Sequence, residues 1–579
     1  MSRRIETSRL AHWVPGLRVL ATYRPAWLQH DLLAGIVLTA LLVPQGMAYA
    51  ELAGLPPVTG LYATMLPLLA YFLFGPSRIL VLGPDSAVSP VVAAAIIPLA
   101  GASADARVEM AAMLALLVGA ILALGAVVGL GFLTDLISKP VRLGYLAGIA
   151  LTVLATQLPK LLGIPLSAES FVEAVRELPG DLDQTDPVAL AIGAGSLAAI
   201  LLVRRAAPKV PGVFIAVAGA TILVAALNLA DEIAVVGPLP EGLPSFTVPS
   251  VSAGDLGRLT LSAFAVALVA FADTSVLSRS YATKLRQSVD QDQELLALGA
   301  ANIASGLFQG FPLSSSSSRT PVAEAAGART QVTGVVAACA LALVLVLGTG
   351  LTKNLPQTTL AAVVMAAVIG LVDLPALRWL RRVNHVDFGL AIAAFLGVVS
   401  FGVLTGIGIA IGLSALAFLW RAWHPYDAVL GRVSGRKGYH DVGRHPDAAL
   451  VPGLLLYRFD APLFFANAGV FRERLLRAVA AAPEAVRMVV VAAEPITDVD
   501  TTAADMLIEL GRELEEGGVE LAFAELKGPA KDKLQAYGLL DLIGEHLFYP
   551  TVGAAVHAYL DRHEVTWRDW EDEAHDAPK

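Results

Sequence analysis

Residues 44–62 read PQGMAYAELAGLPPVTGLY and join two apolar segments of this chain of 579 residues. On either side of Glu51, residues 32–50 and 52–77 contain no charged side chain. A helix that crosses a bilayer takes about 20 mostly apolar residues. The stretch therefore predicts two consecutive membrane spans and an all-α, polytopic membrane domain.

The same pattern recurs through residues 31–424. Residues 259–282 read as a span that contains Asp273, and residues 388–420 have room for two spans. We predict twelve to fourteen spans, after an N-terminal segment over 1–30 that lacks the features of a cleavable signal peptide. The other charge-free runs lie at 86–104, 111–134, 143–159, 187–203, 210–230, 295–318, 330–352 and 354–372.

The composition divides the chain in two. Charged residues number 42 of the 155 in 425–579 but only 49 of the 424 before them. The first part is nearly neutral, and the last part supplies the net charge of −9. That charge argues against nucleic acid as a partner. With Cys339 as the one cysteine and scattered histidines, the sequence predicts no metal site and no cofactor. The sequence also contains no paired acid and base and no arrangement around a nucleophile of the kind that an enzyme would need.

Basic residues predict the orientation in the membrane. Cytoplasmic loops are enriched in Lys and Arg, and the intervening loops at 169–186 and 231–241 are acidic. The rule places both termini and residues 425–579 in the cytoplasm, and the spans in a bacterial cytoplasmic membrane. The basic clusters are Arg3, Arg4, Arg9, Arg18 and Arg24; Lys139 and Arg142; Arg204, Arg205 and Lys209; Lys284 and Arg286; and Arg378, Arg381 and Arg382.

Two spans are interrupted at matching places. Gly75-Pro76 and Gly83-Pro84 bracket a short apolar run, and Gln309 to Pro312 precede five serines. A shift of 228 residues places Pro84 on Pro312. Non-helical backbone inside a membrane has to be buried or line a cavity, and matched interruptions in two halves indicate the binding site of a transporter.

The interruptions predict an anion site. Each reads as an extended segment followed by a helix N-terminus, whose free N–H groups attract anions. Ser314 to Ser318, including Ser316, add hydroxyl donors, and Arg319 adds a positive charge. A charge inside a span is costly and usually functional. The alternative is that the serines cap a helix and Arg319 reaches the cytoplasm.

Four other polar residues are candidates for the same site. Asp273 lies inside a span and could bind a coupling proton or Na⁺, or form a structural salt bridge. Asp85 fits an N-cap that points its charge toward the site. Gln45 and Tyr49 lie four residues apart, on one helix face, and could donate hydrogen bonds to an oxyanion or pack against another helix.

These residues resemble the sulfate permease (SulP) family, which includes the mammalian anion exchangers and prestin. The resemblance covers essentially the whole chain. It implies about fourteen segments in two inverted repeats of seven, core and gate subdomains, an elevator-like movement and a homodimer. The matching stretches are 44–62, 75–78 with 83–84, 237–244, 293–302 and 312–319.

The resemblance also assigns roles to single residues. It implies that the anion is held between the third and tenth segments and that Asp273 is the coupling acid. Leu277 stands where sodium-coupled members carry Thr, which favours a proton over sodium. The implied anion contacts are Gln45, Tyr49, Asp85, Ser86, Ser315, Ser318 and Arg319.

Residues 451–565 alternate between strand and helix patterns, which predicts a small α/β domain. They resemble the STAS domain of the same family, which implies a regulatory protein partner. Asp500 or Thr501 is expected to cap the helix over 501–516. We expect a linker over 425–450 and an acidic tail over 566–579.

We therefore predict a secondary active transporter of a small anion, of the sulfate, bicarbonate or dicarboxylate class, that works by proton symport. The alternatives are an uncoupled channel or an exchanger of anions, and a sodium-coupled bicarbonate transporter. The expected partners are the anion, the proton, the lipid bilayer and a second copy of the chain.

Overall fold

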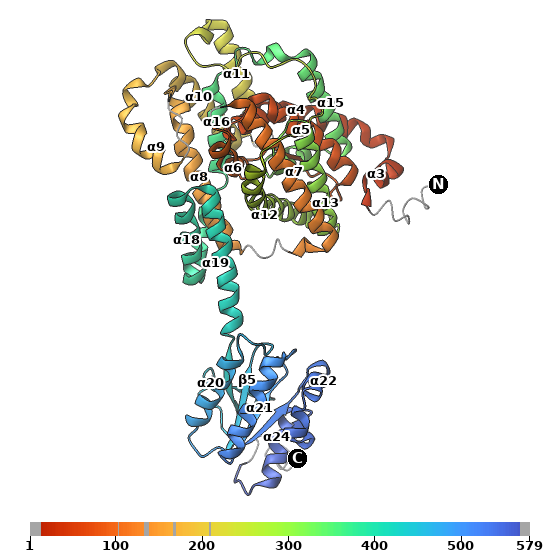
Figure 1. Cartoon of the computed structure of the whole chain (residues 1–579), viewed down its shortest axis with the longest axis vertical. Helices are drawn as coiled ribbons and strands as arrows, with labels where there is room; N and C mark the ends of the chain where they lie inside the picture. The colour runs from red at the N-terminus through yellow and green to blue at the C-terminus, as the bar shows by residue number, and fades with distance from the viewer. Residues whose placement is uncertain (1–12, 102, 133–137, 166–169, 208–209, 568–579) are drawn as a thin grey trace. The chain divides into compact units, whose positions relative to one another are not determined.

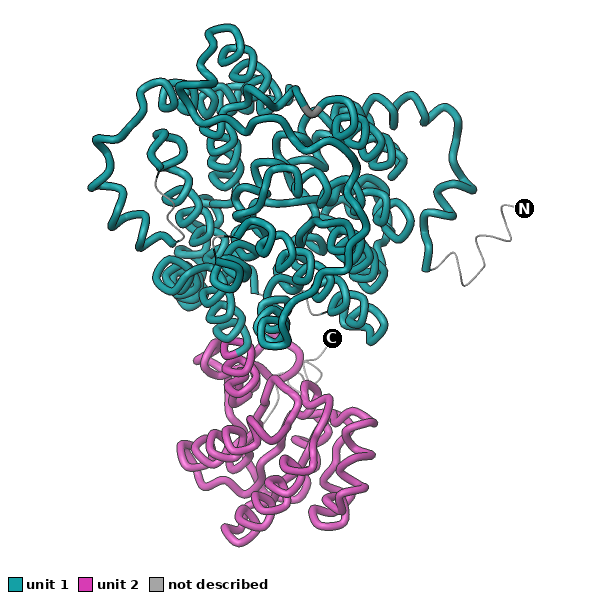
Figure 2. The backbone as a smooth tube through the Cα atoms, turned by 45° about the horizontal axis from the view of Figure 1, so that its top comes forward, with its two compact units in different colours: residues 1–415 teal, residues 416–579 magenta. Residues whose placement is uncertain are grey.

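The computed structural model describes residues 13–101, 103–132, 138–165, 170–207 and 210–567 (Figure 1). Arg3, Arg4, Arg9, Lys209 and the acidic tail from Asp569 lie outside these residues. The chain divides into two compact units, one up to residue 415 and one from residue 416 onward (Figure 2).

The first unit is built of helices with two very short strands. In chain order the elements are α3 (Gly16–Thr22), α4 (Leu28–Leu52), α5 (Pro57–Phe74), β1 (Leu82–Gly83), α6 (Ser89–Ala100), α7 (Ala104–Val128), α8 (Lys139–Leu162), α9 (Phe171–Glu177), α10 (Pro187–Ala206), α11 (Gly212–Leu227), α12 (Ala253–Lys284), α13 (Gln291–Leu307), β2 (Ser314–Ser315), α14 (Arg319–Ala325), α15 (Val332–Leu347), α16 (Gln357–Ile369), α17 (Leu374–Val383), α18 (His385–Phe401) and α19 (Val403–Trp423).

Within the described residues, eight helices are long and apolar enough to cross a membrane by length and composition. They are α4, α5, α7, α8, α10, α12, α16 continued by α17, and α19. Four shorter apolar helices, α6, α11, α15 and α18, accompany them. With α13 and the segment β2–α14 they form two sets of seven, α4 to α11 and α12 to α19, as predicted.

The helices pack in two groups. In the first group α13 packs against α5 and α7, and α15 packs against α4 and α5. In the second group α8 packs against α16 and α18, and α10 packs against α11 and α16. Figure 1 shows α5, α7 and α13 together on the right of this unit and α8, α9 and α10 on the left. We call the groups the core and the gate.

The opening motif of the sequence forms a close helix contact in the core. A Cβ atom on Gly60 of α5 would lie 1.9 Å from the carbonyl oxygen of Gly46 on α4. A side chain at Gly60 would therefore push the two helices apart. Small residues that let helix backbones approach are the usual basis of packing in membranes, where apolar surface gains little from leaving lipid.

Two buried carboxylates hold the ends of core helices together. Asp31 of α4 is fully buried and accepts hydrogen bonds from the backbone N–H groups of Arg329 and Thr330 and from the Thr330 and Thr333 hydroxyls, at 2.7–3.0 Å. Glu294 of α13, also fully buried, accepts from the Tyr71 hydroxyl and from Ser77 Oγ. Buried charge is tolerated when it is hydrogen-bonded in this way.

The second unit is an α/β layer. Its sheet has the order β4-β3-β5-β6-β7-β8; strands β5 to β8 are parallel, and β3 is antiparallel to β4 and β5. Helices α20 and α21 pack on one face and α24 on the other. The elements are β3 (Asp427–Arg432), β4 (Tyr439–Asp441), β5 (Leu454–Phe459), α20 (Ala468–Ala480), β6 (Met488–Ala492), α21 (Thr501–Glu516), β7 (Glu520–Ala524), α22 (Gly528–Ala536), α23 (Leu539–Ile543), β8 (Phe548–Tyr549) and α24 (Val552–Arg562).

The structure corrects one expectation here and supports another. Residues 425–450 were expected to form a linker, but β3 and β4 lie within them and join the sheet, where β3 pairs with β5. Strands β3 and β4 are short, and the turn residues between them obscure the alternation of apolar and polar residues that would predict a strand. Asp500 caps α21, because its Oδ1 accepts from the backbone N–H of Ala503 at 2.8 Å.

Replacing Asp31 by alanine should destabilise the core. Five donors, the four named above and the Tyr23 hydroxyl, would lose their partner, and one such loss in a buried place costs about 1–3 kcal/mol. We expect the melting temperature of the purified full chain to fall by several degrees. Asp255→Ala, at a half-buried position in the first turn of α12, is the control, and equal melting temperatures for both variants would contradict the assigned role.

Candidate functional site

The two interrupted spans meet in the middle of the first unit. Strands β1 and β2 pair antiparallel, with Leu82 opposite Ser315 and Gly83 opposite Ser314. Helix α6 begins six residues after Gly83 and α14 four residues after Ser315. The paired residues are 231 to 233 positions apart in the sequence, so the two halves of the domain contribute one strand each. Both interruptions follow the predicted order of extended segment and helix.

Arg319 links the two interrupted spans. It opens α14 and is fully buried, and its Nη2 donates a hydrogen bond to the carbonyl oxygen of Pro84. Its Nε and Nη1 atoms are buried without a hydrogen-bond partner among the described residues. A buried guanidinium with unpaired donors is costly. An oxyanion, whose oxygens accept hydrogen bonds from the guanidinium fork, would supply what is missing.

A cavity of about 390 Å³ lies beside this arginine, between core and gate. We call it the anion cavity. Its walls come from α4, from the residues between β1 and α6, from α14 and from the gate helices α10, α11 and α16. The polar residues that line it are Gln45, Tyr49, Asp85, Ser86, Arg204, Ser317 and Ser318.

The predicted serines take different positions. Ser86 and Ser318 line the anion cavity. Ser315 is buried behind it with its hydroxyl unpartnered among the described residues, and its backbone N–H donates to Thr274 Oγ1 at 3.1 Å. Ser316 Oγ accepts from the backbone N–H of Arg319 at 3.2 Å and contacts Ser318 Oγ. Ser316 therefore orders the start of α14 and does not line the cavity.

Three further predicted residues surround the cavity. Gln45 and Tyr49 are almost fully buried, and Gln45 Oε1 has no partner among the described residues. Asp85 lies close enough to Tyr49 and Arg319 to act on both electrostatically. Its Oδ1 also accepts from the backbone N–H of Ala87 at 2.7 Å, so it caps the turn before α6. This hydrogen bond occupies one of the N–H groups before α6 that could otherwise bind an anion. The other helix, α14, is short, with only seven residues.

Asp273 has neighbours that differ from those expected. It is half-buried on α12, next to Thr274, and makes no hydrogen bond or ion pair with the described residues. Asp85 and Arg142 are the charged groups that act on it electrostatically, and Arg319 is not among them. The Tyr145 hydroxyl on α8 lies near both acids, buried and without a partner among the described residues.

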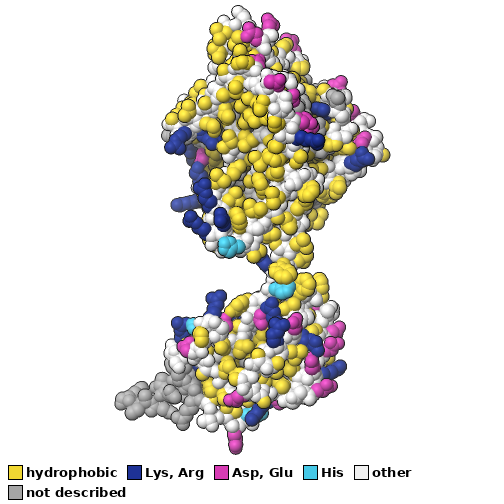
Figure 3. All heavy atoms as spheres, turned by 90° about the vertical axis from the view of Figure 1, so that its left-hand side faces the viewer, with side chains coloured by type: hydrophobic (Ala, Val, Ile, Leu, Met, Phe, Trp, Pro, Cys, Tyr) yellow, Lys and Arg dark blue, Asp and Glu magenta, His cyan; other side chains and the backbone are white. Residues whose placement is uncertain are grey.

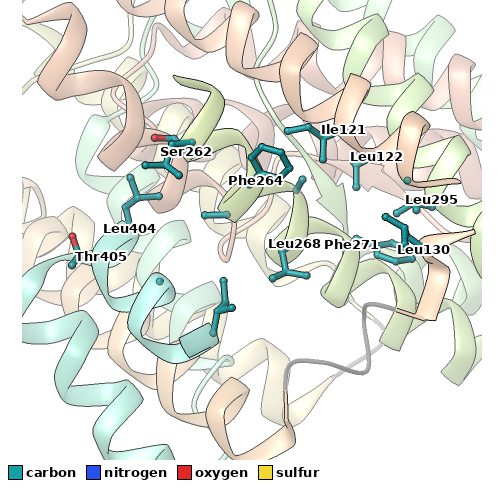
Figure 4. Close-up of a pocket in the computed structure, with 16 residues that line it drawn as sticks. Ile121, Leu122, Leu130, Ser262, Phe264, Leu268, Phe271, Leu295, Leu404 and Thr405 are labelled. Atoms are coloured by element: carbon teal, nitrogen blue, oxygen red, sulfur yellow. The ribbon is translucent and has the colours of Figure 1, made fainter. Parts of the chain in front are cut away.

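A larger cavity, of about 640 Å³, lies between α7, α12 and α19. Figure 4 shows apolar side chains around it, among them Phe264, Leu268 and Phe271 of α12. Such a lining offers almost no hydrogen-bond donors to an anion. The anion cavity is smaller, but most of the predicted polar residues line it and Arg319 follows directly on its lining residue Ser318, so it is the candidate site.

Comparison with known proteins agrees with this geometry. Residues 28–394 match the sulfate permease family, and residues 445–555 match the STAS domain. The chain belongs to the sulfate permease family. This permease is thus an anion transporter with a C-terminal STAS domain and not an enzyme.

Its relatives cover most of its length. The permease is 42% identical to a probable sulfate transporter of Mycobacterium tuberculosis, over 96% of this chain and 100% of the relative. It is 31% identical to the chloroplastic sulfate transporter 4.1 of Arabidopsis thaliana, over 96% and 84% of the two chains. Its fold resembles murine solute carrier 26 family member A9, an anion transporter in the inward-facing state, with a TM-score of 0.88 at 22% identity over 95% and 94% of the chains.

Several residues at the site of this permease were not predicted from the sequence. Thr274 follows Asp273 inside a span, and that position was the only signal for it. Tyr145 lies in an apolar run with nothing to distinguish it. Arg142 and Arg204 were interpreted as loop residues, but Arg142 lies in the first turn of α8 and Arg204 at the wall of the anion cavity.

Gly83→Ala should impair transport by this permease without unfolding it. Gly83 has a φ of +149°, and a Cβ atom there would lie 2.8 Å from Arg319 Nη1. The guanidinium would have to move, and we expect initial anion uptake into proteoliposomes to fall at least about tenfold, as for a loss of about 1.4 kcal/mol. Gly129→Ala, at another positive φ with nothing within 4 Å, is the control. Equal uptake by the two variants would refute the role of Gly83.

Proposed function

We propose that this chain is a secondary active transporter that carries a small oxyanion across the bacterial cytoplasmic membrane by proton symport. The observation that carries the proposal is the buried guanidinium of Arg319, which has two unpaired N–H groups beside the anion cavity. Gln45, Tyr49, Asp85, Ser86, Ser315, Ser316, Ser318 and Arg319 form the anion site or support it.

Sulfate is the anion we favour. The relatives from Mycobacterium tuberculosis and Arabidopsis thaliana are named as sulfate transporters. A tetrahedral oxyanion can accept from a guanidinium fork and from hydroxyl donors at the same time. Arg319 and the serines around it provide both kinds of donor.

Movement of the core against the gate supplies alternating access in this proposal. The anion cavity has walls from both groups, whereas the strands and Arg319 belong to the core. A rigid core that slides along the gate would carry the anion with it and re-form the cavity on the other side. The gate would remain fixed and would form the contact between two copies in a homodimer.

The orientation follows from the basic residues. The anion cavity opens near Arg204 at the end of α10, where the sequence predicts a cytoplasmic loop. On the face in Figure 3, dark-blue Lys and Arg side chains gather along the lower left edge of the first unit. We place this end of the first unit in the cytoplasm, together with the STAS domain and its regulatory partner. In this proposal the membrane domain covers residues 31–424. The STAS domain covers residues 451–565 together with the strands within 425–450.

Asp273 is the proposed coupling residue. Its nearest charged groups are Asp85, on the core, and Arg142, on gate helix α8. If the core moves along the gate, Asp273 leaves Arg142 while it keeps Asp85. Asp273 and Asp85 would then carry two negative charges close together without the positive charge of Arg142. This is unfavourable unless one of the two carboxyl groups takes up a proton. This links protonation to the movement.

Arg319→Ala should abolish transport. Each hydrogen bond to a charged group contributes about 1.5–3 kcal/mol, so loss of two lowers uptake by roughly 100-fold or more. Uptake of labelled sulfate, bicarbonate and fumarate into proteoliposomes is the measurement. Arg204→Ala, at an exposed position on the wall of the same cavity, should retain most of the uptake. Unchanged uptake of every anion by Arg319→Ala would disprove the site.

Asp273→Asn should uncouple transport from the proton gradient. The variant keeps the shape of the side chain but cannot carry the negative charge, so an inward proton gradient should no longer accelerate uptake, while exchange of labelled for unlabelled anion persists. Asp255→Asn, at a half-buried position in the first turn of the same helix, is the matched control. Full gradient dependence in Asp273→Asn would exclude Asp273 as the coupling residue, and a requirement for a sodium gradient would exclude proton symport.

A further inference from the structure

A second polar cavity, of about 530 Å³, lies between core and gate. We call it the α8 cavity, because α8 supplies its polar wall from Thr152 to Lys160. The core contributes α4, α6 and the start of α7, and the gate also contributes α9 and the junction of α18 with α19. Its polar and charged lining residues are Glu51, Arg107, Thr152, Thr156, Gln157, Lys160, Ser170 and Glu173.

The α8 cavity lies on the opposite side of the anion site from the anion cavity. On α4 the anion cavity is lined by Leu41, Gln45 and Tyr49, whereas the α8 cavity begins at Glu51 and continues toward the end of the helix. The same order holds around α6, where Ser86 precedes the helix and faces the anion cavity, and later residues line the α8 cavity. The two cavities therefore lie at successive levels along α4 and α6.

Polar groups in the α8 cavity lack partners. Thr152 is 5% exposed, and its hydroxyl oxygen is buried without a hydrogen-bond partner among the described residues. Gln157 is 6% exposed, and its side-chain amide makes no hydrogen bond to the residues that the structure describes. Buried polar groups are nearly always hydrogen-bonded. Both groups therefore indicate a ligand or water in this cavity.

The charges of the cavity favour an anion of modest affinity. Lys160 lies three residues after Gln157 on the same wall and forms no ion pair with the described residues. Arg107 is held at the rim by hydrogen bonds from its Nε to the Gly101 carbonyl and from its Nη1 to the Gly54 carbonyl. A cation in the cavity would be repelled by the positive charges of both Lys160 and Arg107. Glu51 is close enough to Lys160 to act on it electrostatically, which weakens the attraction for an anion.

We propose that the α8 cavity is a second binding site for a small oxyanion, formed by Thr152, Gln157 and Lys160, through which the transported anion passes on the side opposite to the anion cavity. The proposal rests on the transport function proposed above. The anion is of the class bound at Arg319, but the α8 cavity offers no buried guanidinium, so it binds more weakly and releases the anion more readily.

The test measures whether an anion protects a cysteine in the α8 cavity from modification by a thiol reagent. Thr156 is half-buried and lines the cavity, so Thr156→Cys reports on it, with Cys339→Ser to remove the native thiol. The full chain in proteoliposomes carries Arg319→Ala as well, which removes the anion site and any movement that its occupation causes. The rate of modification by a neutral, membrane-permeant thiol reagent is measured with sulfate, with bicarbonate and with neither.

We expect sulfate or bicarbonate to slow the modification at least about threefold and to do so in a saturable manner. Lys160→Gln and, separately, Thr152→Val should remove this protection, and Lys160→Arg should retain it because the positive charge remains. Modification rates that are equal with and without both anions would overturn the proposal. Protection that persists in both Lys160→Gln and Thr152→Val would overturn it as well.

The two proposals can fail separately. Uptake by the chain with Arg319 intact and by Arg319→Ala is measured in the same preparation. If Arg319→Ala transports normally and protection is still seen, the site at Arg319 is wrong and the α8 cavity stands. If uptake depends on Arg319 but neither anion protects, the α8 cavity is not an anion site.

Discussion

The hydrogen bond from the Arg319 guanidinium to the Pro84 carbonyl holds two interrupted helices together at the centre of the membrane domain. The strands on both sides of it are two residues each, so their own ladder contributes little. Without the arginine, the broken backbone would expose polar groups in a low-dielectric interior. The same side chain keeps two N–H groups unpaired. Structural support and the proposed anion recognition thus depend on one residue.

The rest of the core positions this residue with few polar contacts. Gly46 and Gly60 let α4 and α5 approach, which brings Gln45 and Tyr49 to the cavity. Thr274 on α12 accepts from the backbone of Ser315 and fixes the second strand. Because lipid tails are as apolar as the helices, close contacts and internal hydrogen bonds, not burial of apolar surface, determine such packing.

The interruptions, the serines and the intramembrane charges were predictable, because glycine, proline and charge are unusual inside apolar segments. Their partners were not. Asp273 interacts electrostatically with Asp85 and Arg142, which lie far earlier in the sequence, and no local pattern links the three residues. Tyr145 and Thr152 lie in an apolar run and become distinctive only because their hydroxyls are buried without partners among the described residues. The strands within 425–450 are too short to recognise without the sheet that they join.

The sequence by itself determined that the chain has a membrane domain and a polar α/β domain, since hydropathy and charge depend only on composition along the chain. It also determined which residues carry the unusual chemistry. Only the tertiary structure decided which of them meet. The contact between Arg319 and Pro84 results from the packing of helices that are far apart in the sequence. The positions of the two cavities result from the same packing. No local pattern records such packing, because it depends on the shape of both helix surfaces at once.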